Sequence, residues 1–171
     1  ARGKYVAFLD SDDRWAPNKL EKQVKFMEET GVAFSFTGYR LVDESGRDLR
    51  KSVYVPARLD YNTLLKGNKI ACFTVMINNE LVGSFEMPNV RHEDYATWLT
   101  ILKRGHKAFG INEPLGEYRV SSSSLSGNKL KSAKWTWDLY RQVEKLSFSR
   151  SMYYFLHYIV HGLERFYLKS N

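Results

Sequence analysis

The sequence predicts an α/β fold with a mostly parallel sheet, followed by helices in the C-terminal part of the chain. Residues 6–9 form an apolar run (VAFL) typical of a strand buried on both faces. A helical pattern over 19–29 and a second apolar run over 32–36 follow, and strand, helix and strand within about 30 residues predict a βαβ unit. Residues 130–146 and 152–168 show helical character instead, which predicts two C-terminal helices.

The first helix is predicted over 19–29. Pro17 suits the first helical position, and Leu20, Val24 and Met27 form an apolar stripe that Gly31 ends. The chain then continues extended through 39–42, turns at 43–46, and is irregular or hairpin-like over 47–58. We expect a short helix over 60–65, a buried strand over 73–77 and a helical turn over 80–85.

A second clear helix begins at Glu93. Tyr95, Trp98, Leu99 and Leu102 are spaced as one buried face, and Gly105 suits the position after the last turn. Two short strands over 108–111 and 116–120 and a Ser/Gly-rich loop over 121–128 follow. Glu93 and Asp94 then occupy the first turn of the helix, where the macrodipole stabilises carboxylates, and this is one structural explanation for the pair.

Composition limits the class of protein. The chain has 171 residues, 43% of them hydrophobic, which is enough for one domain with a core. No apolar run reaches the about 18–20 residues of a membrane-spanning helix, and the start shows no signal peptide and enters a strand almost at once, as in a piece that begins inside a domain. Cys72 is the single cysteine, so we expect no intrachain disulfide, no Cys-rich zinc site, a reducing compartment and an inert buried thiol.

The net charge of +7 is concentrated near the C-terminal end. Residues 128–171 contain eight Lys/Arg and three Asp/Glu. Such a basic segment favours an anionic partner, namely a membrane surface, a lipid phosphate or nucleic acid, and a solvated helix face explains it equally well.

The acidic segment after the first strand is the strongest chemical signal. Asp10, Asp12 and Asp13 follow the apolar run within four residues. Ligands of open α/β sheets bind at the carboxyl ends of strands, and clustered carboxylates suit Mg²⁺ or Mn²⁺ together with substrate phosphates. Asp and Ser are also common turn and helix-cap residues, so the segment alone leaves both interpretations open.

Two segments together resemble family 2 inverting glycosyltransferases. Residues 8–21 (FLDSDDRWAPNKLE) resemble the acidic metal-binding segment of that family, and residues 92–99 (HEDYATWL) resemble its second acidic motif. The motifs come in the family's order, with 82 residues between Asp12 and Asp94, and Tyr118 and Arg119 followed by serines resemble a downstream loop of polysaccharide-synthesis members. The resemblance covers about 4–128.

The resemblance implies a GT-A fold, a nucleotide-binding α/β sandwich, without the N-terminal part that such enzymes usually have. Residues 1–128 would be the C-terminal part of the catalytic domain and 129–171 a helical tail. The implied activity is transfer of a sugar from a nucleotide-sugar, a UDP-sugar, to a glycan or lipid-linked acceptor with inversion, in surface polysaccharide synthesis. The processive Gln-x-x-Arg-Trp signature does not follow Asp94, which favours addition of a single sugar. We expect a cytoplasmic protein, and the inner face of the cytoplasmic membrane is a candidate location for it.

The resemblance also assigns residues to the donor diphosphate. Asp12 would be the main ligand of Mn²⁺ or Mg²⁺, and Asp10 would support the metal and the ribose side. Asp13 would cap the turn. Arg119 would reach the diphosphate or remain a surface arginine.

The same resemblance makes Asp94 the general base that removes the proton of the acceptor hydroxyl. Glu93 and His92 would position the acceptor or the sugar, with a structural role as the alternative for the histidine. Trp98 lies on the expected buried helix face, which favours packing over sugar stacking.

The aromatic segment 152–160 predicts burial against the domain, a contact in a homo-oligomer, or peripheral binding to a membrane next to the basic residues. Two other functions are compatible with parts of the sequence. A haloacid dehalogenase-like phosphohydrolase also has Asp-x-Asp after a strand, but Arg14 stands where it needs a small hydroxyl residue. A non-enzymatic basic module would bind nucleic acid or a membrane surface, but no nucleic-acid-binding motif is present, so we expect no nucleic-acid partner.

Overall fold

The computed structural model describes residues 1–120 and 129–170, with side chains in the last helix described as far as Gly162. The strands are β1 (Tyr5–Ala7), β2 (Arg14–Trp15), β3 (Phe34–Val42), β4 (Asp48–Val53), β5 (Arg58–Leu59), β6 (Met76–Asn78) and β7 (Ala108–Arg119). The helices are α1 (Lys19–Thr30), α2 (Tyr61–Leu65), α3 (Asn79–Val82), α4 (Glu93–Lys103), α5 (Lys129–Asp138) and α6 (Phe148–Ser170), with a 3₁₀ turn at Cys72–Thr74 and a π-helical segment at Leu139–Val143.

The sheet is mixed, so the expectation of a mostly parallel sheet is wrong. Its order is β1-β6-β3-β7-β2, with β4 on β3 and β5 on β7. Among the described strands, β3 and β7 form the one parallel pair. The strand–helix–strand crossover from β1 through α1 to β3 is present, but β6 lies between the two strands and is antiparallel to both. Apolar runs report burial and not strand direction, so they do not predict this insertion.

The first strand is shorter and less buried than the apolar run suggests. β1 ends at Ala7, its residues are half-buried, and Leu9 is 50% exposed. Its partner in the sheet is β6. The run therefore divides into a short strand and the start of the acidic loop, rather than forming a strand buried on both faces.

The first helix has the extent predicted from the sequence but buries a different face. α1 ends at Gly31, which has φ of 67°, and begins after Asn18, so that Pro17 lies outside the helix. Lys19, Gln23 and Met27 are buried on it, while Leu20 is 44% exposed. Two polar side chains occupy the face where we expected an apolar stripe.

The segment 108–119 is one strand instead of the two that we expected. β7 pairs in parallel with β3, with Thr37 opposite Ile111 and Gly38 opposite Pro114, so the register shifts next to the proline. A proline donates no ladder hydrogen bond and is tolerated where a bulge interrupts the pairing. Gly38 is required here because a Cβ atom would lie 2.7 Å from the carbonyl oxygen of Val53.

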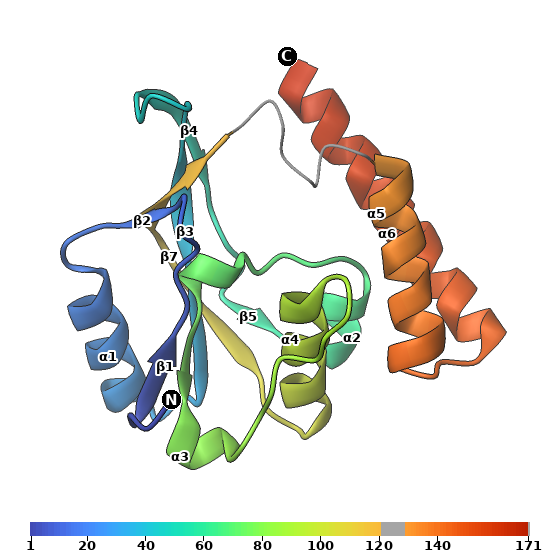
Figure 1. Ribbon diagram of the computed structural model, residues 1–171, viewed down its shortest axis with the longest axis horizontal. Helices are drawn as coiled ribbons and strands as arrows, with labels where there is room; N and C mark the ends of the chain where they lie inside the picture. The colour runs from blue at the N-terminus through green and yellow to red at the C-terminus, as the bar shows by residue number, and fades with distance from the viewer. Residues whose placement is uncertain (121–128, 171) are drawn as a thin grey trace.

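The core lies between the sheet and the helices on one of its sides. Figure 1 shows α1 against one side of the sheet, α2 and α4 on the other side, and α5 and α6 beyond them. The buried cluster includes Phe34 and Phe36 from β3, Trp98 from α4, and Leu139 and Tyr140 from the π-helical segment. The C-terminal helices thus pack on the rest of the chain through the same core.

Hydrogen bonds from tyrosines fix this packing. The Tyr140 hydroxyl donates to the carbonyl oxygen of Leu65 at the end of α2, and the Tyr154 hydroxyl donates to Asn62 Oδ1 at 2.9 Å. Glu144, which is buried, accepts from the Tyr61 hydroxyl and pairs with Lys103 at 3.0 Å. The helices after residue 128 are therefore attached to α2 and α4 by buried polar contacts as well as by apolar packing.

Candidate active site

The acidic loop that follows β1 is held from both sides. The backbone N–H of Asp13 donates to the carbonyl oxygen of Asp10 at 3.2 Å, which closes a tight turn. Asp10 and Asp12 are exposed, whereas Asp13 is buried and accepts from the backbone N–H of Arg119 at 3.2 Å. Burial, together with the negative charges of Asp12 and Asp10, raises the pKa of Asp13 to about 6 against the opposing effect of Arg119. Asp13 thus fixes the loop, and the other two carboxylates point to solvent.

Arg119 ties this loop to a neighbouring turn. Its Nε donates to the carbonyl oxygen of Asp12 at 3.0 Å, and its guanidinium also donates to the carbonyl oxygen of Glu44 at 2.6 Å. The guanidinium is therefore engaged with backbone oxygens next to the acidic loop.

The second acidic motif opens α4. His92 precedes the helix in the left-handed region, with φ of 59° and ψ of 45°, and Glu93 is exposed in the first turn. Asp94 is half-buried and accepts a hydrogen bond from Asn68 Nδ2 at 3.3 Å. Burial raises the pKa of Asp94, and the hydrogen bond from Asn68 and the charge of His92 oppose this rise.

The two motifs, distant in sequence, lie together in space. Burial and then the negative charges of Asp12 and Glu93 raise the pKa of Asp10. Cys72 is within electrostatic reach of both motifs, because burial and then the carboxylates of Asp10, Asp94, Glu93 and Asp13 raise its pKa to about 12. A thiol with such a pKa is protonated at neutral pH, although Cys72 is half-buried and not fully buried as expected.

Aromatic packing accounts for this proximity. Phe8, at the start of the acidic loop, contacts Trp98 on α4 edge to face, with ring centroids 5.3 Å apart. Phe34 of β3 contacts the same indole at 5.3 Å. Trp98 is fully buried, as its predicted packing role requires. The indole therefore joins the segment that carries Asp10 and Asp12 to the helix that begins at Glu93.

The exposed carboxylates of Asp10 and Asp12 fit a hard divalent cation. Within the residues that the structure describes, no group of three or more His, Cys, Asp or Glu side chains forms a protein-only metal site. Magnesium-type sites usually take one or two carboxylates from the protein, with water and substrate phosphate oxygens completing the coordination. Burial and then repulsion from Asp12 and Glu93 raise the pKa of Asp10, and a bound cation would offset both effects.

Three neighbours of the site were not identified from the sequence. Asn68 comes shortly after the helix expected over 60–65 and hydrogen-bonds to Asp94. Cys72 lies beside the carboxylates, and Trp135 of α5 packs against His92, with ring centroids 5.6 Å apart, and beneath the Arg91 guanidinium at 5.3 Å. No local motif marks these residues.

The His92 Nε2 atom is buried and, in the described part of the chain, has no hydrogen-bond partner.

Comparisons with known proteins identify the family of the chain. Residues 1–82 match the family described as Glycosyl transferase family 2. The chain is 48% identical over 166 residues to TuaG of Bacillus subtilis (strain 168), named for teichuronic acid biosynthesis, covering 96% of this chain and 66% of that protein. It is 37% identical over 166 residues to WfgD of Escherichia coli, named a UDP-Glc:alpha-D-GlcNAc-diphosphoundecaprenol beta-1,3-glucosyltransferase, covering 96% and 64% of the two chains.

Solved structures share the fold. The crystal structure of S. aureus TarS 1-349 in complex with UDP superposes with a TM-score of 0.56 at 14% identity, covering 93% of this chain and 47% of that one. The complex of the same protein with UDP-GlcNAc gives 0.56 at 12% identity, with 93% and 48% covered. The sheet with its flanking helices is thus a GT-A fold, as predicted. The chain belongs to glycosyltransferase family 2.

Proposed function

We propose that the protein containing this chain transfers one sugar from a UDP-sugar to a lipid-linked acceptor, with inversion at the anomeric carbon and with the help of a divalent metal. The relatives named for teichuronic acid synthesis and for an acceptor on diphosphoundecaprenol support the acceptor class. The TarS complexes with UDP and UDP-GlcNAc support the donor class. The chain spans 64–66% of the length of these relatives, so the activity is proposed for the whole protein and is tested in it.

The observation that carries the proposal is the proximity of the two acidic motifs. Inversion in a single displacement needs the donor diphosphate on one face of the sugar and a base for the acceptor hydroxyl on the other. Asp10 and Asp12 suit the diphosphate side, and Asp94, which Asn68 orients, suits the base. In this assignment, the acceptor oxygen bonds to the anomeric carbon, the bond to the diphosphate breaks, and the hydroxyl proton passes to an Asp94 carboxylate oxygen.

The environment of Asp94 suits this role. A general base is most effective when its pKa approaches the working pH, and burial raises the pKa of Asp94 in that direction. Glu93 is exposed one residue earlier and would position the acceptor or the sugar, together with His92. Asp10 and Asp12 would hold Mn²⁺ or Mg²⁺, which when bound supplies Lewis-acid neutralisation of the departing diphosphate.

The base assignment is tested in the full-length protein by Asp94→Asn, which keeps the shape and removes the proton acceptor. We expect transfer to fall by about a thousandfold or more, within the usual range for loss of a catalytic acid–base group. UDP-sugar binding, measured by calorimetry, should remain within about twofold. The matched control is Glu86→Gln, an exposed carboxylate outside the site. Near-normal turnover of Asp94→Asn would exclude this residue as the base.

The metal assignment is tested by thermal unfolding. Ligands that bind the folded state stabilise it by about 2.7 kcal/mol at a hundred times their dissociation constant. We therefore expect UDP with Mn²⁺ to raise the melting temperature of the full-length protein. Asp12→Ala should abolish the share of this increase that depends on Mn²⁺. Glu21→Ala, an exposed acid on α1, serves as the control. An undiminished Mn²⁺ effect in Asp12→Ala would contradict the assignment.

We further propose that α6 lies on an anionic membrane surface. No helix in residues 1–120 and 129–170 is long and apolar enough to cross a bilayer. Exposed apolar side chains instead follow one another at helical spacing along α6, and exposed basic residues lie on α5, in the segment that connects α5 to α6, and on α6. The apolar set is Phe148, Met152, Leu156 and Val160, and the basic set includes Lys134, Arg141, Lys145 and Arg150. This combination is typical of helices that bind in the interface of anionic bilayers.

Vesicle sedimentation tests the membrane proposal. Binding to vesicles containing phosphatidylglycerol should exceed binding to neutral vesicles and weaken with salt. Leu156→Glu should reduce it about tenfold or more, whereas Leu130→Glu, at an exposed position of α5 outside the stripe, should have little effect. If Leu156→Glu leaves vesicle binding unchanged but dissociates a dimer in size-exclusion chromatography, the stripe contacts a second copy of the chain instead.

A further inference from the structure

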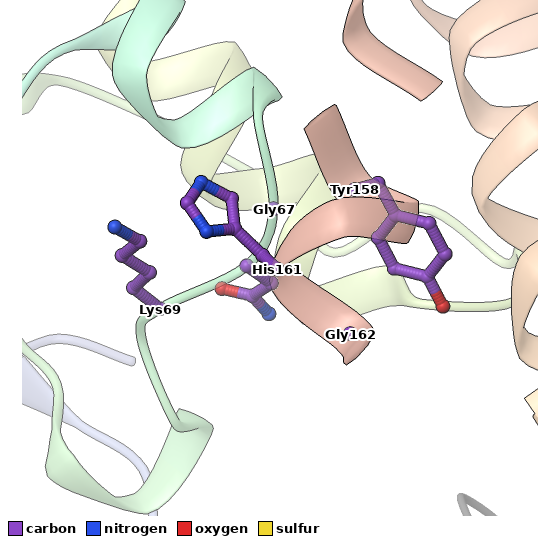
Figure 2. A pocket seen from close by; sticks show the side chains of 6 residues that line it. Gly67, Lys69, Tyr158, His161 and Gly162 are labelled. Atoms are coloured by element: carbon purple, nitrogen blue, oxygen red, sulfur yellow. The ribbon is translucent and has the colours of Figure 1, made fainter. Parts of the chain in front are cut away.

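A pocket lies beside the candidate base, outside the acidic loops. Its walls come from two places in the chain: Gly67, Asn68 and Lys69 after α2, and Tyr158, His161 and Gly162 on α6. The cavity measures about 140 Å³. Figure 2 shows the Lys69 side chain and the His161 imidazole reaching the same side of the α6 backbone, with the Tyr158 ring directed the other way. The pocket thus presents two nitrogen-bearing side chains from different elements to one space.

Asn68 connects this pocket to the site of reaction. Its Nδ2 donates to Asp94 Oδ2 at 3.3 Å, and its Oδ1 accepts from the backbone N–H of Ile70 at 3.0 Å. The same residue is therefore a wall of the pocket and the hydrogen-bond partner of the proposed base. A group bound in the pocket lies next to the acceptor hydroxyl that Asp94 would deprotonate.

The chemistry of the walls favours an anionic group. An ammonium and an imidazole supply donors, and no acidic residue is among the described residues that line the pocket. Two glycines leave the space open, and a Cβ atom built on Gly162 would meet no atom within 4 Å. Lysine is a common partner of phosphate groups, to which its ammonium contributes a point charge.

We propose that this pocket binds the phosphate that joins the acceptor sugar to its lipid carrier. The proposal rests on the proposed sugar transfer to a lipid-linked acceptor and places its headgroup at Lys69 and His161. The sugar would then extend past Asn68 to Asp94, and the lipid would leave along α6, the helix that carries the exposed apolar stripe. α6 would thus contribute to acceptor selection as well as to membrane contact.

The test compares two acceptors in the full-length enzyme. One carries the acceptor sugar on a farnesyl diphosphate, and the other carries the same sugar on a neutral octyl group. Lys69→Gln should raise KM for the diphosphate-linked acceptor about tenfold or more, and leave KM for the octyl glycoside and for the UDP-sugar within about twofold. Lys66→Gln is the matched control, because Lys66 is half-buried in the same segment and does not line the pocket.

The alternative outcomes are distinct. An equal rise in KM for both acceptors would overturn the phosphate assignment, and a rise confined to the UDP-sugar would place the donor diphosphate in the pocket instead. Binding of the diphosphate-linked acceptor is also measured directly by calorimetry, which needs no turnover. Lys69-dependent binding without any sugar transfer would contradict the proposed function while retaining the pocket as a phosphate site. Gly162→Leu, checked for folding by circular dichroism, should block this binding by filling the space.

Discussion

At the scale of single residues, Lys19 is a charged side chain inside the core. It is fully buried, its Nζ donates to Gln23 Oε1 at 2.7 Å, and it lies 4.4 Å from the centroid of the Trp15 ring. Gln23 in turn donates to Ser35 Oγ at 3.1 Å and to the carbonyl oxygen of Thr74 at 3.0 Å. Burial lowers the pKa of Lys19 from 10.5 to about 8. The folded protein therefore binds this proton less tightly than the unfolded chain does.

This shift predicts a pH dependence of stability. Between the folded and unfolded pKa values the unfolded state holds more protons, so the contribution of Lys19 to stability increases as pH rises. Relative to Lys19→Met, the wild-type protein should gain about 2 kcal/mol between pH 7.5 and 9.5. Urea unfolding of both proteins across this range measures the difference, and groups common to both cancel. A difference that is constant with pH would show that the Lys19 pKa is not lowered.

Cys72 gives a second prediction at this scale. Burial and the surrounding carboxylates raise the pKa of Cys72 to about 12, so very little thiolate exists at pH 8. Alkylation by iodoacetamide should therefore be about a hundredfold slower or more in the folded protein than in guanidinium chloride, because the thiolate is the reactive form. Mass spectrometry of the modified protein measures both rates. Equal rates in the two states would place the thiol away from the acidic motifs.

At the scale of elements, the contact between Phe8 and Trp98 joins the acidic loop to α4. A buried aromatic pair contributes about 0.5–1.5 kcal/mol beyond the area it buries. A double-mutant cycle with Phe8→Leu and Trp98→Phe should give a coupling free energy in this range. Urea unfolding measures this coupling free energy. The control cycle combines Trp98→Phe with Phe26→Leu, a substitution on α1. A coupling energy near zero would mean that other contacts hold the two segments together.

Comparison of particular elements shows what the sequence can predict. The α4 helix was predicted almost to the residue, because an apolar face with helical spacing and Gly105 after it are local signals. The buried face of α1 was predicted wrongly, because Gln23 is buried through hydrogen bonds to β3 and the 3₁₀ turn and Lys19 through its hydrogen bond to Gln23, which no local pattern reveals. The placement of β6 between β1 and β3 depends on tertiary packing in the same way.

For the candidate site, too, local signals were predictable from the sequence and tertiary packing was not. The acidic residues were recognisable because short motifs preserve the residue types that a chemistry needs, so Asp10, Asp12, Glu93 and Asp94 stood out. Their proximity depends on the core and is visible in the structure through the contact between Phe8 and Trp98. Asn68 carries no motif, and its relation to Asp94 arises from the packing of α2 against α4.

At the scale of the whole molecule, the C-terminal helices are part of the folded unit. Tyr140 is fully buried, and its hydroxyl donates to the carbonyl oxygen of Leu65. Tyr140→Phe should reduce the free energy of unfolding by about 1–3 kcal/mol, since it leaves a buried carbonyl without its partner. Tyr140→Ala should cost about 3–5 kcal/mol through the added cavity. Chemical denaturation monitored by circular dichroism measures both.

The number of transitions in these denaturation curves shows whether the C-terminal helices unfold together with the sheet. If the helices after residue 128 unfold together with the sheet, each variant should show a single transition by circular dichroism and by tryptophan fluorescence. Tyr153→Phe, at a 52% exposed position of α6, is the control and should change little. A separate low-stability transition would show that α5 and α6 fold independently of residues 1–120.

The contact between Phe8 and Trp98 has an evolutionary consequence. Because a buried aromatic contact brings the two acidic motifs together, their spacing does not depend on Lys69 and His161, which line the pocket beside α6. Substitutions at Lys69 and His161 can therefore change what the pocket binds while the placement of Asp10, Asp12 and Asp94 is kept. Surveys of natural variants should find the two regions changing at different rates.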